Sequence, residues 1–361
     1  MINSPKYKDI VEWAVEQIST GTFKPNDRFL SETELGNKFG FSRQTVRRAL
    51  EVLEQQGYIS RIQGSGTYIS SSKPPPSAMD RDRSRTVGIV STYLDNYIFP
   101  SIVRGIEGVL SSDGYAVQLA STNNSVETEA RSLQLMMDRR VDGLIIVPTR
   151  SALPCINLDL YNTIIQRGIP VVFIDSFYPE LSIPYVTLDD EMAGYIATQH
   201  LISLGHRNIS GIFSHINRQG HLRYLGYARA LKEHGIPVQE ERIFWYSKES
   251  LQQMLHGNEL LECLTKCTAA VCFNDHMALL LIDYLRQNGR SIPEDLSVVG
   301  IDNSEPAKIS SLTSVIHPSV ELGEAAARLL LSIINGGERK NVLFRPQLQI
   351  RGSVRQLELK V

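Results

Sequence analysis

From residue 86 onward, short apolar runs alternate with amphipathic stretches that have helical spacing. Bounded apolar runs predict buried strands, and the repeated order strand, helix, strand predicts βαβ units and parallel sheets. Right-handed crossovers would then place helices on both faces of each sheet. The predicted strands are Thr86–Thr92, Ala116–Ser121, Gly143–Val147, Pro170–Asp175, Ile209–Phe213, Ala269–Phe273 and Leu296–Ile301.

The strands fall into two series, which favours two lobes over one large sheet. The first four strands complete one wound unit, and the helix after Asp189-Asp190 starts a second. The segments 312–316 and 319–334 follow, and then a strand-like tail at 342–352. Two α/β lobes joined by several chain crossings leave a cleft, and ligands bind such sheets beyond the carboxyl ends of the strands. The predicted fold class is therefore α/β, with two parallel doubly wound sheets in two lobes.

The residues before position 70 follow a different pattern, in which helices precede a hairpin. Tyr7–Ile18 is amphipathic, and Ser31-Glu-Thr-Glu34 has the form of a capping box that opens a short helix ending at Gly40. Ser42 then caps a second helix, Arg43–Leu53. A short helix, a tight turn and a helix with a polar start predict a helix-turn-helix.

The start of the helix after Ser42 carries the chemistry that suggests DNA. Arg43, Gln44 and Arg47 gather there, and this end of a helix-turn-helix enters the major groove. Arginine can bind guanine in a bidentate way, and glutamine can bind adenine. The alternating runs around Gln63-Gly-Ser-Gly66 predict a β-hairpin whose bare tip can approach DNA closely. We therefore expect a small winged helix-turn-helix (α+β) domain that binds double-stranded DNA.

The stretch from residue 70 to residue 85 separates the two patterns. Its serines, three consecutive prolines and alternating charges leave almost nothing to bury, so we expect a linker. The expected organisation is a DNA-binding domain over residues 1–70, a flexible linker over 71–85, and a two-lobed effector-binding and dimerisation domain over 86–361.

Composition and charge add limits. The formal net charge of −2 means that no global basic field points to nucleic acid, so the DNA prediction rests on the local motif. The N-terminus lacks a secretory signal and no apolar stretch could span a bilayer, so we expect a cytoplasmic protein with no membrane partner. Because we expect the protein to bind DNA, we also expect it to associate with the nucleoid.

The chain contains no recognisable catalytic or metal-binding motif. No nucleophile elbow, phosphate-binding loop or dinucleotide-binding fingerprint is found, so we expect no enzyme and no cofactor. His276 follows Cys272 by four residues, but no Cys-x-x-Cys pair is present, so we expect buried structural thiols and no metal site. The cysteines are Cys155, Cys263, Cys267 and Cys272.

Polar side chains follow most of the predicted strands, where a cleft ligand would bind. Carboxylates, amides and arginine suit sugar hydroxyls, and aromatic rings suit the apolar face of a sugar. Some of these polar residues should simply cap helices, Ser319 and Asp189 in particular. The candidate effector contacts are Tyr93, Tyr97, Asn123, Arg150, Asp175, Gln219, Arg223, Asn274, Asp302 and His317.

The head resembles the winged helix of the GntR family. The resemblance is carried by Phe39-Gly-Phe-Ser-Arg-Gln-Thr-Val-Arg-Arg-Ala-Leu50 and by Gly64-Ser-Gly-Thr67, and it covers residues 5–70. Glu32 would support the other contacts or meet cytosine amino groups. The DNA contacts that the resemblance implies are Glu32, Ser42, Arg43, Gln44, Arg47, Gln63 and Gly64.

The body resembles the effector domain of the LacI family, which is itself similar to periplasmic sugar-binding proteins. Pro170-Val-Val-Phe-Ile-Asp175, Cys272-Phe-Asn-Asp275 and the run from Ile292 to Asp302 are among the stretches that carry this resemblance. His317 departs from the commoner amide or acid at its position. The effector contacts that the resemblance implies are Asp175, Arg223, Asn274, Asp302 and His317.

Fewer kinds of protein combine a GntR-type head with a LacI-type body than contain either domain alone. With Tyr97–Glu107 and Arg218-Gln-Gly220, the combination resembles a group of sugar-responsive repressors, which implies L-arabinose as the effector. The resemblance also implies a homodimer that reads a palindromic operator and releases it when the sugar binds.

The residues themselves indicate only a small polar ligand, so two alternatives stay open. The same architecture could respond to a purine or a sugar phosphate, for which Arg150, Arg218 and Arg223 are available. The body could also be a plain sugar-binding module of periplasmic type, although the winged head argues against that reading.

Overall fold

The chain forms two compact units, Met1–Arg83 and Ser84–Val361. The computed structural model describes residues 7–19, 22–24, 26–55, 58–62, 66–70, 83–94 and 98–357. Most of the predicted linker, 71–82, therefore lies outside the described residues, and so do Gln63, Gly64 and Tyr97. Among the described residues, no helix is long and apolar enough to cross a membrane.

The first unit is a helix-turn-helix followed by a hairpin, as the sequence predicts. Strands β1 and β2 pair antiparallel, with Ile59 opposite Ile69. Buried apolar side chains from α1, α3 and both strands form its core, among them Ile10, Leu50 and Ile59. The elements are α1 (Tyr7–Ser19), α2 (Glu32–Phe39), α3 (Arg43–Gln55), β1 (Ile59–Ile62) and β2 (Gly66–Ile69).

Both ends of α2 have the chemistry that the sequence predicts. The Ser31 hydroxyl accepts a hydrogen bond from the Glu34 amide, and the Glu34 carboxylate accepts one from the Ser31 amide at 2.8 Å, which completes the capping box. Gly40 ends the helix in the left-handed region, with φ 68°, and its N–H donates to the Gly36 carbonyl. A side chain is rarely tolerated in that backbone conformation. The turn at Gly40 sets the direction of α3.

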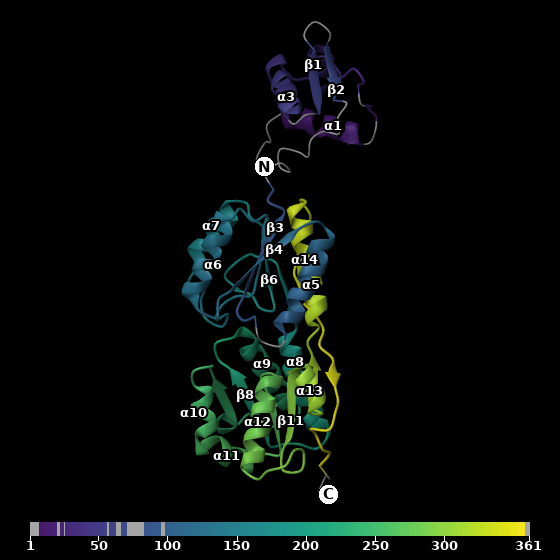
Figure 1. The fold of residues 1–361 in the computed structure, drawn as a ribbon. Helices are drawn as coiled ribbons and strands as arrows, with labels where there is room; N and C mark the ends of the chain where they lie inside the picture. The colour runs from purple at the N-terminus through teal and green to yellow at the C-terminus, as the bar shows by residue number, and fades with distance from the viewer. Residues whose placement is uncertain are drawn as a thin grey trace. The chain divides into compact units, whose positions relative to one another are not determined.

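The second unit has two lobes, each built on a six-stranded sheet (Figure 1). The sheet of the N-terminal lobe has the order β13-β7-β6-β5-β3-β4, and all its strand pairs are parallel. Helices α5 and α14 cover one face, and α6 and α7 cover the other. The elements up to the first crossing are β3 (Thr86–Ser91), α5 (Phe99–Ser112), β4 (Ala116–Ser121), α6 (Val126–Asp138), β5 (Gly143–Ile146), α7 (Leu158–Gln166), β6 (Val171–Ile174) and β7 (Tyr185–Leu188).

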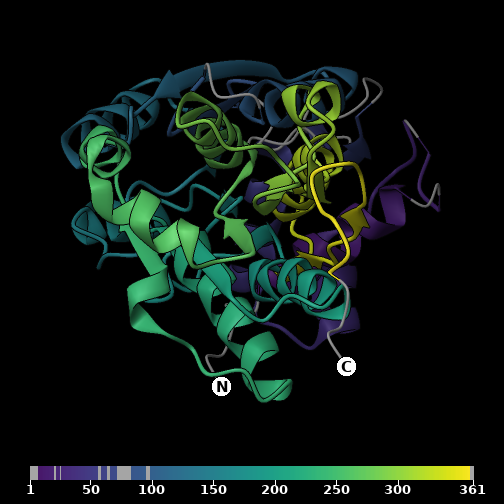
Figure 2. The same cartoon turned by 90° about the horizontal axis from the view of Figure 1, so that it is seen from below.

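The sheet of the C-terminal lobe has the order β14-β12-β11-β10-β8-β9 and is parallel except for the edge strand β14. Helices α8 and α9 pack on one face, and α11 and α12 on the other; the view from below shows this lobe in front (Figure 2). The elements are α8 (Asp190–Ser203), β8 (Ile209–Ser214), α9 (Arg218–Glu233), η1 (Glu240–Arg242), β9 (Ile243–Tyr246), α10 (Leu251–His256), α11 (Asn258–Thr265), β10 (Ala269–Cys272), α12 (Asp275–Gln287), β11 (Ser297–Asp302), α13 (Glu305–Ile309) and β12 (Thr313–Ile316).

The chain passes between the lobes at three places in the described structure. It leaves the N-terminal lobe after β7, returns after β12 to form α14 (Ser319–Ile334) and β13 (Val342–Phe344), and crosses again to form β14 (Leu348–Gln349). Leu322, Ala326 and Leu330 of α14 belong to the core of the N-terminal lobe. The strand-like tail predicted at 342–352 is thus two short strands, one in each sheet.

Successive side chains along a buried strand point to opposite faces of the sheet and pack into the core on each side. In β3, Val87 and Ile89 join the core under α5 and α14, and Val90 joins the core under α6 and α7. The helices also approach closely where glycine allows it. A Cβ on Gly226 of α9 would lie 1.8 Å from the Glu191 carbonyl oxygen of α8. The backbones of α8 and α9 are therefore in direct contact.

Candidate functional site

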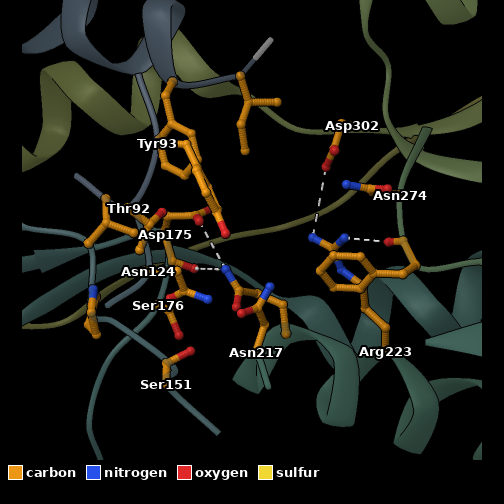
Figure 3. Close-up of a pocket in the computed structure, with 16 residues that line it drawn as sticks. Thr92, Tyr93, Asn124, Ser151, Asp175, Ser176, Asn217, Arg223, Asn274 and Asp302 are labelled. Carbon is orange, nitrogen blue, oxygen red and sulfur yellow. Dashed lines mark hydrogen bonds and ion pairs between the residues drawn. The ribbon is translucent and has the colours of Figure 1, made fainter. Parts of the chain in front are cut away.

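A pocket lies between the carboxyl ends of the strands in the two lobes (Figure 3). This is the position at which parallel α/β sheets bind ligands. Each lobe contributes charged, amide and aromatic groups to it. The pocket is lined by Thr92, Tyr93, Ile98, Phe99, Asn124, Val147, Pro148, Ser151, Asp175, Ser176, Asn217, Gln219, Arg223, Phe273, Asn274 and Asp302.

Asp175 joins the lobes on one side of this pocket. It follows β6 and is 6% exposed, and its carboxylate accepts a hydrogen bond from Gln219 Nε2 at 2.9 Å. His317, which follows β12, places Nε2 3.2 Å from the other carboxylate oxygen. Its Nδ1 lies 2.7 Å from the Ser319 hydroxyl. One carboxylate of the N-terminal lobe thus holds two side chains of the C-terminal lobe.

The charge state of His317 follows from these contacts. Burial alone would lower its pKa, because burial penalises the charged imidazolium. The hydrogen bond from His317 to Asp175 and the charges of Asp175 and Asp302 outweigh burial and raise the pKa above its ordinary value. A raised pKa means that the imidazolium of His317 persists to higher pH than that of a free histidine.

Arg223 lies on the opposite side of the pocket and is almost fully buried. Its Nε donates to Asp190 Oδ1 at 2.8 Å, and its Nη2 is 3.9 Å from Asp302 Oδ1. Nη1 donates to the Phe273 carbonyl, and the guanidinium also lies 4.8 Å from the centre of the Phe273 ring. Burial raises the pKa of Asp190, although the charge of Arg223 opposes this. Arg223 is thus fixed by contacts behind and beside it.

Ten of the sixteen residues that line the pocket were not among the predicted contacts, and two of these ten are Asn124 and Ser176. Asn124, rather than Asn123, lines the pocket, and its Oδ1 accepts a hydrogen bond from the Arg150 amide at 2.8 Å. Ser176 is 4% exposed, and its hydroxyl has no hydrogen-bond partner among the described residues. A buried hydroxyl without a partner is unfavourable unless a ligand or water completes its hydrogen bonds. No sequence signal distinguished either residue from its neighbours.

The predicted effector contacts are divided between the pocket and its surroundings. Asn123 and Arg150 do not line the pocket, and the Arg150 side chain is exposed. His317 does not line the pocket but bonds to the lining residue Asp175, and Tyr97 lies outside the described residues. The structure brings together Tyr93, Asp175, Gln219, Arg223, Asn274 and Asp302.

The backbone around the pocket adopts conformations that side chains rarely tolerate. Asn124, Asp175 and Asp302 have φ values of 59°, 67° and 121°. Strained backbone of this kind clusters where ligands bind, because the surrounding structure must hold it. Each of the three follows or ends a strand, and all three line the pocket.

In the first unit, the predicted DNA contacts that the structure describes lie on one surface. Ser42, Arg43, Gln44 and Arg47 are all exposed at the start of α3. Glu32 of α2 lies 4.0 Å from Arg47 Nε, so it can support this arginine from the neighbouring helix. The opposite side of α3 is buried through Val46, Ala49, Leu50 and Leu53.

Comparison with known proteins finds a different family match in each of the two units. The profile of the bacterial regulatory proteins of the gntR family matches residues 6–69. That of the periplasmic binding protein-like domain matches residues 198–354. The arabinose metabolism transcriptional repressor of Geobacillus stearothermophilus is 39% identical, over 98% of this chain and 98% of the relative. The chain belongs to the family of arabinose metabolism transcriptional repressors.

A second relative agrees with membership of the arabinose metabolism transcriptional repressors, and a solved structure agrees with a LacI-type body. The repressor of that name from Halalkalibacterium halodurans is 37% identical over 96% of each chain. A LacI family transcriptional regulator from Enterococcus faecium, solved with bound ribose, is 29% identical. It matches 76% of this chain and 100% of its own, with a TM-score of 0.65. This arabinose-repressor family member is thus a transcriptional repressor with a GntR-type DNA-binding head and a LacI-type sugar-binding body.

Proposed function

We propose that this repressor binds operator DNA through α3 and releases it when L-arabinose binds the pocket of the second unit. The observation that carries the choice of a neutral sugar is the charge of the pocket. Among the residues that line the pocket, Asp175 and Asp302 supply carboxylates and Arg223 supplies the guanidinium, while His317 bonds Asp175 from outside the lining. Carboxylates and amides accept hydrogen bonds from sugar hydroxyls, and Arg223 can donate to them.

The same charges disfavour a sugar phosphate as the effector. Such a ligand would need cations that are free to meet it, but Arg223 is already paired with Asp190 at 2.8 Å. Neither Arg150 nor Arg218 lines the pocket, and the Arg218 guanidinium lies 4.5 Å from the centre of the Phe177 ring. A phosphate would therefore face two carboxylates with no unpaired arginine beside them.

The proposed effector contacts come from both lobes. Tyr93 would pack on the sugar, and the uncommitted hydroxyl of Ser176 would bond a sugar hydroxyl. On the DNA side we propose Ser42, Arg43, Gln44 and Arg47, with Glu32 in support. The full set of proposed effector contacts is Tyr93, Asn124, Asp175, Ser176, Gln219, Arg223, Asn274 and Asp302.

The contacts between the lobes provide a route for coupling. The Arg218 amide donates to the Ser151 hydroxyl at 3.0 Å, and the Ala152 amide donates to the Ile216 carbonyl at 3.2 Å. Lys248 of the C-terminal lobe lies 5.3 Å from the centre of the Tyr93 ring. A sugar held by both lobes would favour the closed arrangement in which these contacts form, and an effector shifts an equilibrium only through such a difference.

We further propose that two copies pair through the body with two-fold symmetry, so that two heads read a palindromic operator in the cytoplasm at the nucleoid. Closure of the lobes would then change the spacing of the heads. The mechanism requires that free protein bind the operator and that liganded protein bind it weakly.

The test is fluorescence anisotropy of a palindromic operator probe with the full chain. L-arabinose is titrated at fixed salt concentration, because phosphate contacts make DNA affinity salt-dependent. D-galactose, a purine and arabinose 5-phosphate serve as controls. Release by L-arabinose alone supports the proposal. Release by the purine or the phosphate would reassign the effector, and binding that no ligand changes would refute the coupling.

A further inference from the structure

Two cysteine thiols of the C-terminal lobe lie side by side, away from the sugar pocket. Cys263 is in the last turn of α11, and Cys267 follows the residue that caps this helix, Lys266. Their Sγ atoms are 4.0 Å apart. The described part of the chain contains no cluster of three or more metal-ligating side chains, so this pair is not part of a larger metal site.

The two thiols differ in exposure and acidity. Cys263 is partly exposed, whereas Cys267 is buried. The hydrogen bond with Cys267, together with the charges of Arg242 and Lys266, lowers the pKa of Cys263 to about 7 despite partial burial. The pKa of Cys267 is raised by the same hydrogen bond and by burial. A lowered pKa increases the fraction of thiolate at a given pH, and the thiolate is the reactive form.

The other two cysteines have none of these features. Cys155 and Cys272 are buried, and each lies outside any thiol pair in the described residues. Burial raises the pKa of Cys155 to about 12 and also raises that of Cys272. The chain therefore contains internal reference thiols that should react slowly.

We propose that Cys263 and Cys267 form an oxidation site at which a hydroperoxide converts the two thiols into one intramolecular disulfide. In the first step, the Cys263 thiolate attacks the hydroperoxide, the O–O bond breaks, and Cys263 becomes a sulfenic acid as the alcohol or water leaves. In the second step, Cys267 attacks the sulfenic sulfur, the S–O bond breaks, and water leaves. The sulfurs lose two electrons, which the hydroperoxide gains.

The local backbone permits the approach that this reaction needs. A disulfide requires the sulfurs to move from 4.0 Å to about 2 Å apart. Residues four apart at a helix end lie on one face, so a small shift of this helix end together with rotation of both side chains would bring the sulfurs together. The Lys266 amide donates to the Cys263 carbonyl, and the Cys267 amide to the Leu264 carbonyl, so a tight turn already ends the helix here. The closed loop is so short that the bond would add little stability. It acts as a reversible modification and not as a structural staple.

The test compares thiols in the folded full-length chain. The reduced protein is treated with a small molar excess of hydrogen peroxide, then denatured and alkylated, and its intact mass is measured. The expected result is that two of the four thiols escape alkylation, and that the peptide with Cys263 and Cys267 is lighter by two hydrogens. Dithiothreitol should restore all four thiols.

Two variants separate the steps. In Cys267→Ser, dimedone should capture a sulfenic acid at position 263, because no resolving thiol remains. In Cys263→Ser, the other thiols should stay reduced over the same time. Equal midpoints of urea denaturation for both variants and the parent chain confirm that they are folded. Oxidation of Cys155 or Cys272 at the same rate, a disulfide between chains, or four intact thiols would overturn the proposal.

Discussion

Arg223 Nε lies 2.8 Å from Asp190 Oδ1, and the two side chains are 4% and 3% exposed. This ion pair joins α9 to α8 behind the pocket, while the same guanidinium reaches toward Asp302 in front of it. Asp190 therefore positions Arg223 without lining the pocket. Removal of one partner from a buried pair leaves the other charge uncompensated, which is far less favourable than loss of an exposed pair.

The first prediction concerns this pair. Asp190→Ala should lower the free energy of unfolding by about 3–5 kcal/mol and weaken L-arabinose binding, because Arg223 loses its anchor. Asp190→Asn retains an acceptor for Arg223, so it should reduce the free energy of unfolding and the affinity for L-arabinose by less. Urea denaturation and sugar titration measure the two effects. The control is Glu233→Gln, which removes an exposed partner of Arg229. If Asp190→Ala matches this control, the pair does not position Arg223.

The second prediction concerns pH. Since the folded-state pKa of His317 is raised, its stabilising contribution is fully present below the unfolded pKa and is lost as pH rises through the folded pKa. His317→Gln should thus lower the Tm most near about pH 6, and the difference should shrink toward about pH 9. Differential scanning fluorimetry at constant ionic strength measures this. Exposed His256 supplies the control variant, His256→Gln. If the difference in Tm between His317→Gln and the parent protein is the same at every pH, the assignment of a raised pKa to His317 is contradicted.

The third prediction separates DNA binding from sugar binding. Arg43→Ala should weaken operator binding by about ten- to hundredfold, because a bidentate contact to a base contributes roughly 1–3 kcal/mol. Sugar affinity should be unchanged. Anisotropy with the operator probe and calorimetry with L-arabinose give the two numbers. Arg328→Ala, an exposed arginine of α14, is the matched control. An unchanged operator affinity in Arg43→Ala would remove this residue from the interface.

The fourth prediction concerns the contact between α8 and α9. Gly226→Ala should destabilise the protein by about 1–3 kcal/mol, because its Cβ would overlap the Glu191 carbonyl oxygen. Gly108→Ala places a methyl group on α5 where no atom lies within 4 Å, so it should be neutral or stabilise by up to about 1 kcal/mol. Chemical denaturation distinguishes the two. Equal effects would mean that the helices can separate freely.

Strands buried on both faces could be predicted from the sequence, because continuous apolar runs such as Gly143–Ile146 admit few other readings. Two strands were missed. β7 has only four residues, among them the polar Thr187, and lies between a proline-containing loop and a helix cap. β9 is the half-exposed edge of its sheet and follows charged residues. Neither has a periodicity that is distinct from a loop, and only pairing with a neighbour defines them.

The acids at strand ends could also be predicted, but their partners could not. Asp189 caps α8 through the Met192 amide, as expected, whereas the adjacent Asp190 turns to meet Arg223, thirty-three positions away. The expected cap by Ser319 is wrong, because Pro318 occupies the N-cap of α14 and no side chain caps this helix. Such a pair depends on how two helices pack, which local sequence does not encode. The choice between Asn123 and Asn124 depends on backbone angles in one turn, where both residues have positive φ.

The placement of α14 has a consequence for how the protein is made. Residues 319–334 supply, with α5, one layer of a lobe whose strands begin at residue 86. A ribosome must therefore translate as far as residue 334 before the N-terminal lobe can bury its apolar face. The C-terminal lobe lacks only β14 by that stage, so it can fold while the N-terminal lobe is still incomplete. Chaperone demand during synthesis should accordingly centre on the sheet that leaves the exit tunnel first.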